Sequence, residues 1–276
     1  MGTLAELVRG GLQTPDTVQY GGGVAHSFTV VFCSIDDVKC RNTIALYERL
    51  LQKVEHEIIV IRDARSLAEA YNRAAGQARG DIVILSHDDI DVLAPDFAGR
   101  LADSLRSADI VGVIGGAKLA GPRWSSCGHP HLSGWITHRE PSGTTYDVDL
   151  VSPLPRAMDL KLLDGVFLAA RRHVLASVRF DESTFDGFHL YDLDWTYRAA
   201  EAGFRIATAG DLLVVHQSRG RFASEWQRYA DRFCEKYSIE YVPPREPVKI
   251  YEQTLDSEDQ VRRFFAQMMS LDNAAS

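Results

Sequence analysis

Three acidic residues and a histidine stand together directly after an apolar stretch of the chain. The segment Ser86-His-Asp-Asp-Ile-Asp91 follows the apolar run 81–85. Carboxylates this close repel one another unless a cation or solvent relieves the charge, and hard divalent cations are bound by such oxygens. We interpret the segment as a divalent metal site for a phosphorylated ligand. The alternative is a polar turn in which Asp88 or Asp91 only caps a neighbouring element.

Two more carboxylates lie in the segment Tyr191-Asp-Leu-Asp-Trp195. Asp192 and Asp194 are two positions apart, so on a helix their side chains point to different sides. One could face a cleft as a general base while the other caps the helix or pairs with Arg198. The alternative is that both only add negative charge that favours the start of the helix.

Two weaker signals occur later in the chain. His216 ends the apolar run 212–215, where it is either a ligand or a structural residue. In Asp164-Gly165 the glycine would let the backbone approach a ligand closely. The glycines between 112 and 121 open no helix, so the context argues against a dinucleotide-binding fingerprint.

The elements that must position these residues alternate between strands and helices. Short apolar runs at 28–33, 57–61, 81–85 and 109–114 predict buried strands, and the stretches between them have the apolar spacing of helices. Ser66 and Glu69 form a capping box that opens one of these helices. This pattern predicts an α/β fold with a mostly parallel central sheet flanked by helices. Ligands bind such sheets at the carboxyl ends of the strands, where the acidic segment falls.

The second half of the chain has a different pattern. Residues 117–157 are rich in Gly, Pro, Ser and His and are interpreted as a loop-rich recognition segment. A helix over 191–202, strands over 204–207 and 212–216, an aromatic helical stripe over 222–237 and a last helix near Ser257 follow. We divide the chain into an appendage (1–26), one domain (27–240) and a C-terminal helical extension (241–276).

Composition and charge exclude several classes of protein. The 276 residues carry 30 Lys plus Arg against 38 Asp plus Glu, a net charge of −8, which argues against nucleic-acid binding. No apolar run approaches the ~20 residues that span a bilayer, and the first ten residues lack the apolar core of a signal peptide. The four cysteines form no CxxC pair and no zinc site, which fits a reducing cytoplasm: Cys33, Cys40, Cys127 and Cys234.

The order of these segments resembles the family-2-like glycosyltransferases of the GT-A fold. The resemblance runs from about Phe28 to about Arg219. It is carried by segments similar to that family's second helix, DxD segment, glycine-containing strand, Glu-Asp pair and C-terminal histidine. These are Ser66–Asn72, Ile84–Ile90, Leu163–Arg171, Tyr191–Asp194 and Val215-His216.

The resemblance implies a set of metal ligands. Asp89 matches the metal-binding Asp of the DxD segment, and His87 stands where its first Asp would be. Asp88 is a second candidate for the same role, and Asp91 is a further candidate ligand. His216 matches the family's C-terminal ligand. The implied cofactor is Mn²⁺ or Mg²⁺.

The resemblance also implies a base and a donor-binding edge. Asp192 matches the catalytic base, although Tyr191 replaces the Glu of the pair. Donor-binding roles fall on Ser34, Arg62, Asp63, His87, Asp88, Asp164 and Gly165. The family usually has an Asp where Arg62 stands here, which leaves the choice of nucleotide open.

The function implied is that of a metal-dependent inverting glycosyltransferase. Residues 27–116 would bind a nucleotide-diphosphate sugar, and 117–220 a saccharide or other hydroxyl acceptor. Trp124, Trp135 and Tyr146 could stack on acceptor sugars or only pack beneath a loop. A nucleotidyltransferase and a catalytically degenerate nucleotide-sugar-binding protein are the alternatives, and homo-oligomerisation stays open.

Overall fold

The computed structural model describes residues 26–139, 143–152, 156–218, 224–241 and 251–275. The expected appendage, except for residue 26, lies outside the described residues. So do Phe222 of the expected aromatic stripe and Pro243-Pro244.

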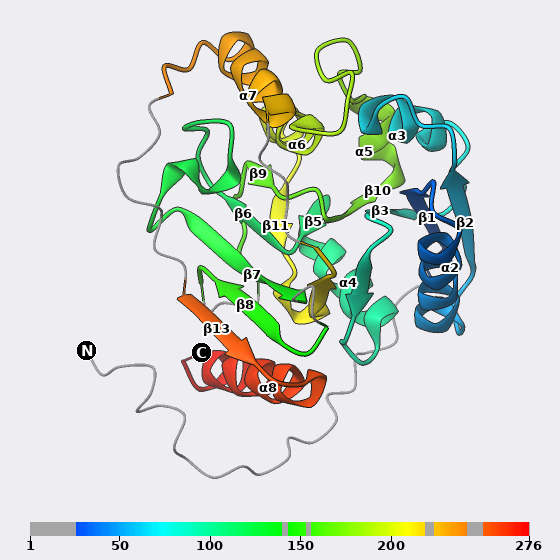
Figure 1. Ribbon diagram of the computed structural model, residues 1–276, viewed down its shortest axis with the longest axis vertical. Helices are drawn as coiled ribbons and strands as arrows, with labels where there is room; N and C mark the ends of the chain where they lie inside the picture. The colour runs from blue at the N-terminus through cyan, green and yellow to red at the C-terminus, as the bar shows by residue number, and fades with distance from the viewer. Residues whose placement is uncertain (1–25, 140–142, 153–155, 219–223, 242–250, 276) are drawn as a thin grey trace.

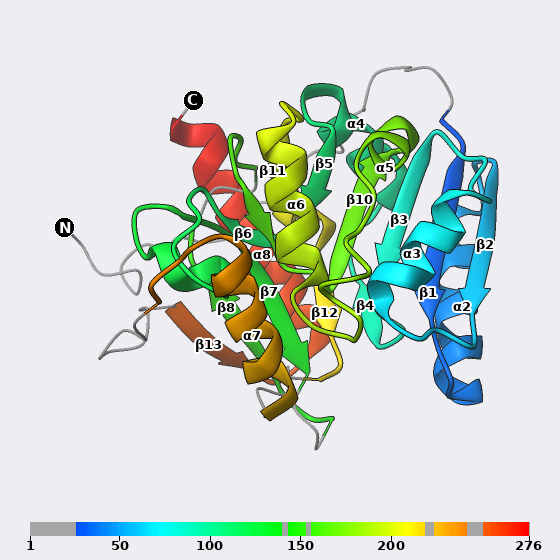
Figure 2. The ribbon, with the colours of Figure 1, turned by 90° about the horizontal axis from the view of Figure 1, so that it is seen from above.

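The main sheet has six strands in the order β11-β5-β10-β3-β1-β2 (Figures 1 and 2). All run in the same direction except β10, which is antiparallel to both of its neighbours. The expected mostly parallel sheet is therefore confirmed. The strands are β1 (Phe28–Cys33), β2 (His56–Ile61), β3 (Ile82–Ser86), β5 (Ile110–Gly112), β10 (Phe167–Arg171) and β11 (Ile206–Thr208).

Helices cover both faces of this sheet because successive strand residues point to opposite sides. Val30 and Phe32 pack into one core with α2 (Asp37–Leu51) and α4 (Phe97–Ser107). Val31 packs into the other core with α3 (Leu67–Ala75), α5 (Arg172–Ser177) and α6 (Tyr191–Glu201). Figure 2 shows α3 and α6 on one side of the sheet and α2 on the other.

The predicted cap of α3 is present. The backbone N–H of Glu69 donates to Oγ of Ser66 at 3.0 Å. The Glu69 carboxylate reaches back to the N–H of Arg65 at 3.4 Å, one residue earlier than the capping box predicts.

A second sheet lies beside the first and has the order β13-β8-β7-β12-β4, in which β6 also pairs with β7 and β9 pairs with β6. Its core contacts α8 (Glu258–Ala275), where the rings of Trp135 and Phe265 lie 5.0 Å apart. The expected C-terminal helix is thus confirmed. The strands are β4 (Ile90–Val92), β6 (Ile114–Gly116), β7 (Leu132–Arg139), β8 (Tyr146–Leu150), β9 (Leu162–Leu163), β12 (Val214–His216) and β13 (Tyr251–Leu255).

Two predictions about local structure were wrong. The segment 117–157 was expected to be loop-rich, yet it contains β7 and β8, which pair over five residues from Trp135 to Arg139. The apolar run 109–114 was expected to be one strand. It breaks at Val113, so β5 joins the main sheet and β6 joins the second. The second error has a long-range cause: β5 pairs with β10 and β11, which lie far along the chain, and the local pattern does not record where such pairing ends.

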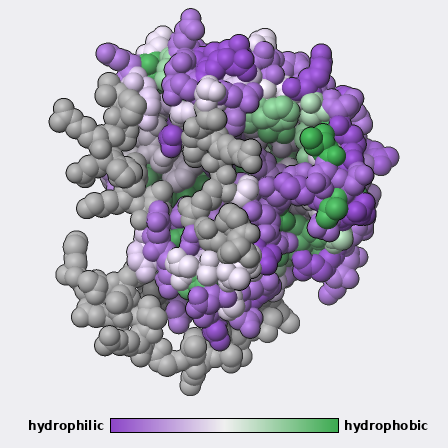
Figure 3. Space-filling view, in the orientation of Figure 1, coloured by the Kyte–Doolittle hydropathy of each residue, from purple (hydrophilic) through white to green (hydrophobic). Residues whose placement is uncertain are grey.

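The molecular surface is mostly polar on the face seen in Figure 3, where hydrophobic side chains form only small separate patches. None of the helices in the described ranges has the length and apolar character that crossing a membrane requires.

Candidate active site

The acidic segment and the C-terminal histidine meet where the two sheets adjoin. β3 ends at Ser86, and the chain passes through His87, Asp88 and Asp89 into β4. β4 pairs antiparallel with β12, which places His216 opposite Ile90. This pairing brings together two motifs that are more than 120 residues apart in the sequence.

Three of these side chains converge on one point. Ligand atoms of His87, Asp89 and His216 all lie within 4.8 Å of one another. Oδ1 of Asp89 is 3.2 Å from Nε2 of His216 and 3.9 Å from Nδ1 of His87. Two imidazoles and one carboxylate form a donor set that suits a divalent transition ion, so the residues fit the implied metal.

Two members of the triad have pKa shifts toward the forms that bind metals. Burial alone would raise the pKa of Asp89, but the hydrogen bond and charge of His216 outweigh it and hold that pKa well below its usual range. Burial lowers the pKa of His87, and the neighbouring His216 lowers it further. Asp89 is therefore anionic and His87 neutral near pH 7, which are the forms that bind metals.

The other two acidic residues of the segment lie outside the triad. The Asp91 carboxylate, on β4, accepts a hydrogen bond from the side-chain amide of Gln217. The Asp88 carboxylate lies 3.7 Å from Nζ of Lys39, and its backbone carbonyl accepts from Oγ1 of Thr43 at 2.9 Å. The structure thus brings Asp89 and His216 together with His87, and leaves Asp88 and Asp91 at the edge of the group.

Polar side chains that the sequence analysis missed support the triad. Oγ of Ser218 donates to Oδ2 of Asp89 at 3.0 Å and lies 3.3 Å from Nε2 of His216. Nζ of Lys39 is 3.4 Å from the same Asp89 oxygen. Nδ1 of His138, on β7, lies 3.0 Å from the Ser218 carbonyl. The position of Ser218, two residues after His216, could have indicated that it lies near the predicted ligand.

Asp192 forms the second part of the site, in the first turn of α6. Its Oδ2 accepts a hydrogen bond from the backbone N–H of Gly165 at 2.7 Å. Burial and then the negative charge of Asp164 raise the pKa of Asp192 to about 7. Asp164 itself is held by Nε1 of Trp124 at 3.1 Å. A carboxylate whose pKa lies near 7 is suited to general-base chemistry.

Gly165 is required by a close approach to α6. A Cβ at this position would lie 2.6 Å from the hydroxyl oxygen of Tyr191 and 2.8 Å from Cβ of Asp192. A ligand was expected beside Gly165, and the structure places these two side chains there.

We expect Gly165→Ala to displace Asp192 because the added methyl group cannot fit beside it. Overpacking of this kind costs about 1–3 kcal/mol of stability, and the shifted carboxylate should lower kcat about 10-fold. Thermal unfolding and steady-state kinetics would measure both effects. Gly76→Ala is the control, because a Cβ there meets its nearest neighbour at an ordinary 3.6 Å. Equal behaviour of the two variants would contradict the prediction.

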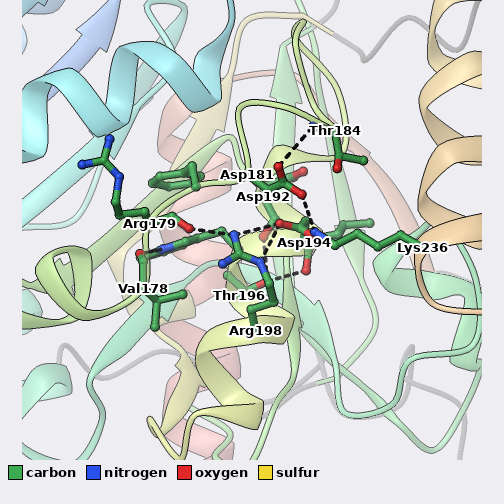
Figure 4. Close-up of polar contacts among 12 residues, drawn as sticks. Val178, Arg179, Asp181, Thr184, Asp192, Asp194, Thr196, Arg198 and Lys236 are labelled. Atoms are coloured by element: carbon green, nitrogen blue, oxygen red, sulfur yellow. Dashed lines mark hydrogen bonds and ion pairs between the residues drawn. The ribbon is translucent and has the colours of Figure 1, made fainter.

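Asp194 has the role expected of the other carboxylate of the pair. It is fully buried, and its Oδ2 accepts from Nε of Arg198 at 2.9 Å. Its Oδ1 accepts from the hydroxyl of Tyr237 at 2.6 Å and from the ammonium group of Lys236. Figure 4 shows Arg198 and Lys236 directed at this carboxylate. Asp194 thereby joins α6 to α7 (Ser224–Lys236) and the residue that follows it.

The predicted donor-binding residues on β1 and β2 lie at the carboxyl ends of their strands, outside the triad. Ser34 is buried, and its N–H donates to the Ile61 carbonyl at 3.1 Å. Arg62 pairs with Asp37 at the start of α2. Asp63 accepts two hydrogen bonds from the guanidinium of Arg73, at 2.8 and 3.2 Å.

The aromatic residues proposed for sugar stacking differ in their surroundings. Trp135 is 1% exposed and donates through Nε1 to the Gly210 carbonyl at 2.9 Å. Stacking of Trp135 on a sugar is therefore wrong, because its ring is part of the core. Tyr146 is half-buried, with the guanidinium of Arg139 5.8 Å from its ring centre.

The chain was compared with curated protein sequences and with solved structures. Curated protein sequences contain no match to this chain. Among solved structures, a mannosyltransferase from Pyrobaculum calidifontis in complex with GDP-Man and Mn²⁺ is 15% identical, with a TM-score of 0.49 over 80% of this chain and 67% of its own. GalNAc-T7 with UDP, GalNAc and Mn²⁺ is 10% identical, with a TM-score of 0.49 over 76% of this chain. The match spans about half (48%) of the GalNAc-T7 chain.

A family model provides the stronger result. The model of a glycosyltransferase-like family matches residues 29–237, which is more than half of the chain. The matched range includes the triad, Asp192 and all of the main sheet except Phe28, the first residue of β1. The GT-A arrangement expected from the motifs agrees with this assignment. The chain belongs to this glycosyltransferase-like family, and its enzyme class is that of the glycosyltransferases.

Proposed function

We propose that the protein is a metal-dependent, inverting glycosyltransferase that moves a sugar from a nucleotide-diphosphate donor to an acceptor hydroxyl. One observation carries the proposal: the triad and the base belong to one connected site. The hydroxyl of Tyr191 lies 3.5 Å from Nε2 of His87 and 3.4 Å from the Gly165 carbonyl. The N–H of Gly165 in turn binds Asp192.

Asp89, His216 and His87 would hold the metal ion. Two imidazole ligands favour Mn²⁺ over Mg²⁺, because Mg²⁺ prefers oxygen ligands and keeps its waters. When bound, the ion supplies positive charge that stabilises the leaving diphosphate. We leave Asp91 out of the proposed ligand set, because it is not among the side chains whose ligand atoms lie within 4.8 Å of one another.

Asp192 would accept the proton of the acceptor hydroxyl during attack on the sugar. The hydrogen bond from Gly165 fixes its orientation, and burial beside Asp164 keeps its pKa near 7, so a large fraction is ready to take a proton. One base and one displacement predict inversion of configuration at the anomeric carbon.

The remaining candidates would serve the donor. Ser34, Arg62, Asp63, Asp88 and Asp164 follow the ends of strands at the edge where the triad lies. Residues 27–116 would bind the donor and 117–220 the acceptor, a saccharide or another hydroxyl compound. We place the reaction in the cytoplasm. The proposed reaction does not depend on whether the protein forms homo-oligomers.

Transfer from a panel of nucleotide sugars, with Mn²⁺ and then with excess chelator, tests the proposal directly. Nuclear magnetic resonance of the product would report its anomeric configuration. Metal-independent transfer or retention of configuration would contradict it. Metal-dependent binding of donor without transfer or hydrolysis would favour the degenerate binding protein.

We expect Asp89→Asn and His216→Ala each to weaken Mn²⁺ binding about 10- to 100-fold, because each removes a ligand. Calorimetry with Mn²⁺ would measure the affinities, and circular dichroism would monitor the fold. Asp91→Asn is the control and should leave the affinity unchanged. If His216 were only structural, His216→Ala would lower Tm while the folded protein kept its affinity for Mn²⁺.

A further inference from the structure

We infer that Lys39 is a cation that the protein itself supplies to the metal site. Its ammonium group would neutralise the carboxylates of Asp88 and Asp89 when no divalent ion is bound. When a divalent ion is bound, the ammonium group would bind the donor's diphosphate. The inference rests on the proposed function and adds to it a residue that couples metal binding to donor binding.

Lys39 lies in the first turn of α2, at the carboxyl end of β1. Its Nζ is 3.4 Å from Oδ2 of Asp89 and 3.7 Å from Oδ1 of Asp88, so it bridges both carboxylates. Asp89 is also the carboxylate of the triad. The ammonium group and a metal ion would therefore compete for the same ligand.

The helix that carries Lys39 is fixed against the triad. Oγ1 of Thr43, one turn further along α2, donates to the carbonyl of Asp88 at 2.9 Å. Lys39 and Thr43 are four residues apart, so they share one face of the helix. The backbone of Lys39 is thus held in place beside the triad.

The ion pairs of Lys39 are weak enough to exchange. Its side chain is 48% exposed, and ion pairs of exposed lysines contribute little to stability. A divalent ion in the triad would repel the ammonium group, because both are positive and only a few ångströms apart. The flexible stem of lysine lets the group move without a change in the backbone.

The displaced ammonium group would bind the diphosphate of the donor. The N–H groups of Val38 and Lys39 in the first turn of α2 are not free to bind it, since both donate to Oδ1 of Asp36, at 2.7 and 2.9 Å. The Lys39 side chain is then the cationic donor that this helix end presents beside the triad. Lysine binds phosphate through short charge-assisted hydrogen bonds.

Lys39→Gln should shift two affinities in opposite directions. Mn²⁺ alone should bind about 3- to 10-fold more tightly, because a competing positive charge is gone. Inorganic pyrophosphate, added at saturating Mn²⁺, should bind about 10- to 100-fold more weakly, because a charge-assisted hydrogen bond is lost. Titration calorimetry on the full chain, with electron paramagnetic resonance of free Mn²⁺, would measure both.

Arg41→Gln is the matched control. It makes the same charge change on an exposed residue of the same helix and should alter either affinity less than about 2-fold. Lys39→Arg keeps the charge and should leave Mn²⁺ affinity close to that of the unchanged protein.

Parallel shifts of the two affinities in Lys39→Gln would overturn the inference, since they indicate a merely structural role. So would unchanged affinities, or no pyrophosphate binding to the unchanged protein. If these results came with Mn²⁺ binding that still depends on Asp89, the proposed metal site would stand and only the role of Lys39 would fall. Mn²⁺ binding unaffected by Asp89→Asn would overturn both.

Discussion

Replacing Asp192 with asparagine is expected to lower kcat about 10²- to 10⁴-fold while the affinity for the donor stays nearly unchanged. The asparagine oxygen can still accept the hydrogen bond from Gly165, so the geometry of the site is kept. The proton acceptor alone is removed. Steady-state kinetics of sugar transfer, beside donor binding by calorimetry, would separate the two effects.

The pH dependence of the unchanged protein gives a second measurement of the same residue. Its kcat/KM should rise with pH through an apparent pKa near 7, the value to which burial and Asp164 raise Asp192. A fully active Asp192→Asn variant would exclude this residue as the base and transfer that role to another carboxylate.

The raised pKa of Asp192 also predicts how the stability of the fold changes with pH. Folded Asp192 holds its proton up to about pH 7, whereas its ordinary value is 3.8, so the folded state binds more protons between these values. Its contribution to stability therefore falls as pH rises through that window. Asparagine cannot ionise, so Asp192→Asn should become more stable, relative to the unchanged protein, between pH 5 and pH 8.

Removal of Asp194 should have the largest effect on stability. Asp194→Ala leaves two cationic groups, those of Arg198 and Lys236, without the buried carboxylate that binds both. Breaking a buried ion pair in this way costs about 3–5 kcal/mol. Urea unfolding, followed by circular dichroism, would measure the loss of unfolding free energy.

Glu201→Ala provides the control for this prediction because it lies on the same helix. The Glu201 carboxylate pairs with Lys161, but both side chains are about half exposed. The expected cost is below about 1 kcal/mol. A similar loss for the two variants would show that burial of Asp194 does not set its contribution.

Local patterns in the sequence were sufficient for several elements of the main sheet and its helices. The apolar run 28–33 and the cap at Ser66 are both found in the structure, because each depends on neighbours within one strand or one turn. Helical spacing also predicted that Asp192 and Asp194 point to different sides, whereas the choice of Asp192 as the base came from the family resemblance.

The remainder depends on contacts between distant parts of the chain. His87 was assigned to donor binding, but it lies beside His216 because β4 pairs with β12, and no local pattern records that pairing. For Trp135 the sequence left open sugar stacking or packing beneath a loop, and β7 carries the residue into the core. The edge strand β13, which pairs with β8, was missed for the same reason.

The break at Val113 has a mechanical consequence for the site. β5 hydrogen-bonds in the main sheet and β6 in the second, with one buried residue between them. A hinge needs several residues that can change their backbone angles, whereas Val113 alone links β5 to β6. Relative rotation of the two sheets here would break strand hydrogen bonds on one side or the other. We therefore expect the proposed substrates to enter and leave through movement of side chains and loops, with the two sheets held together at this crossing.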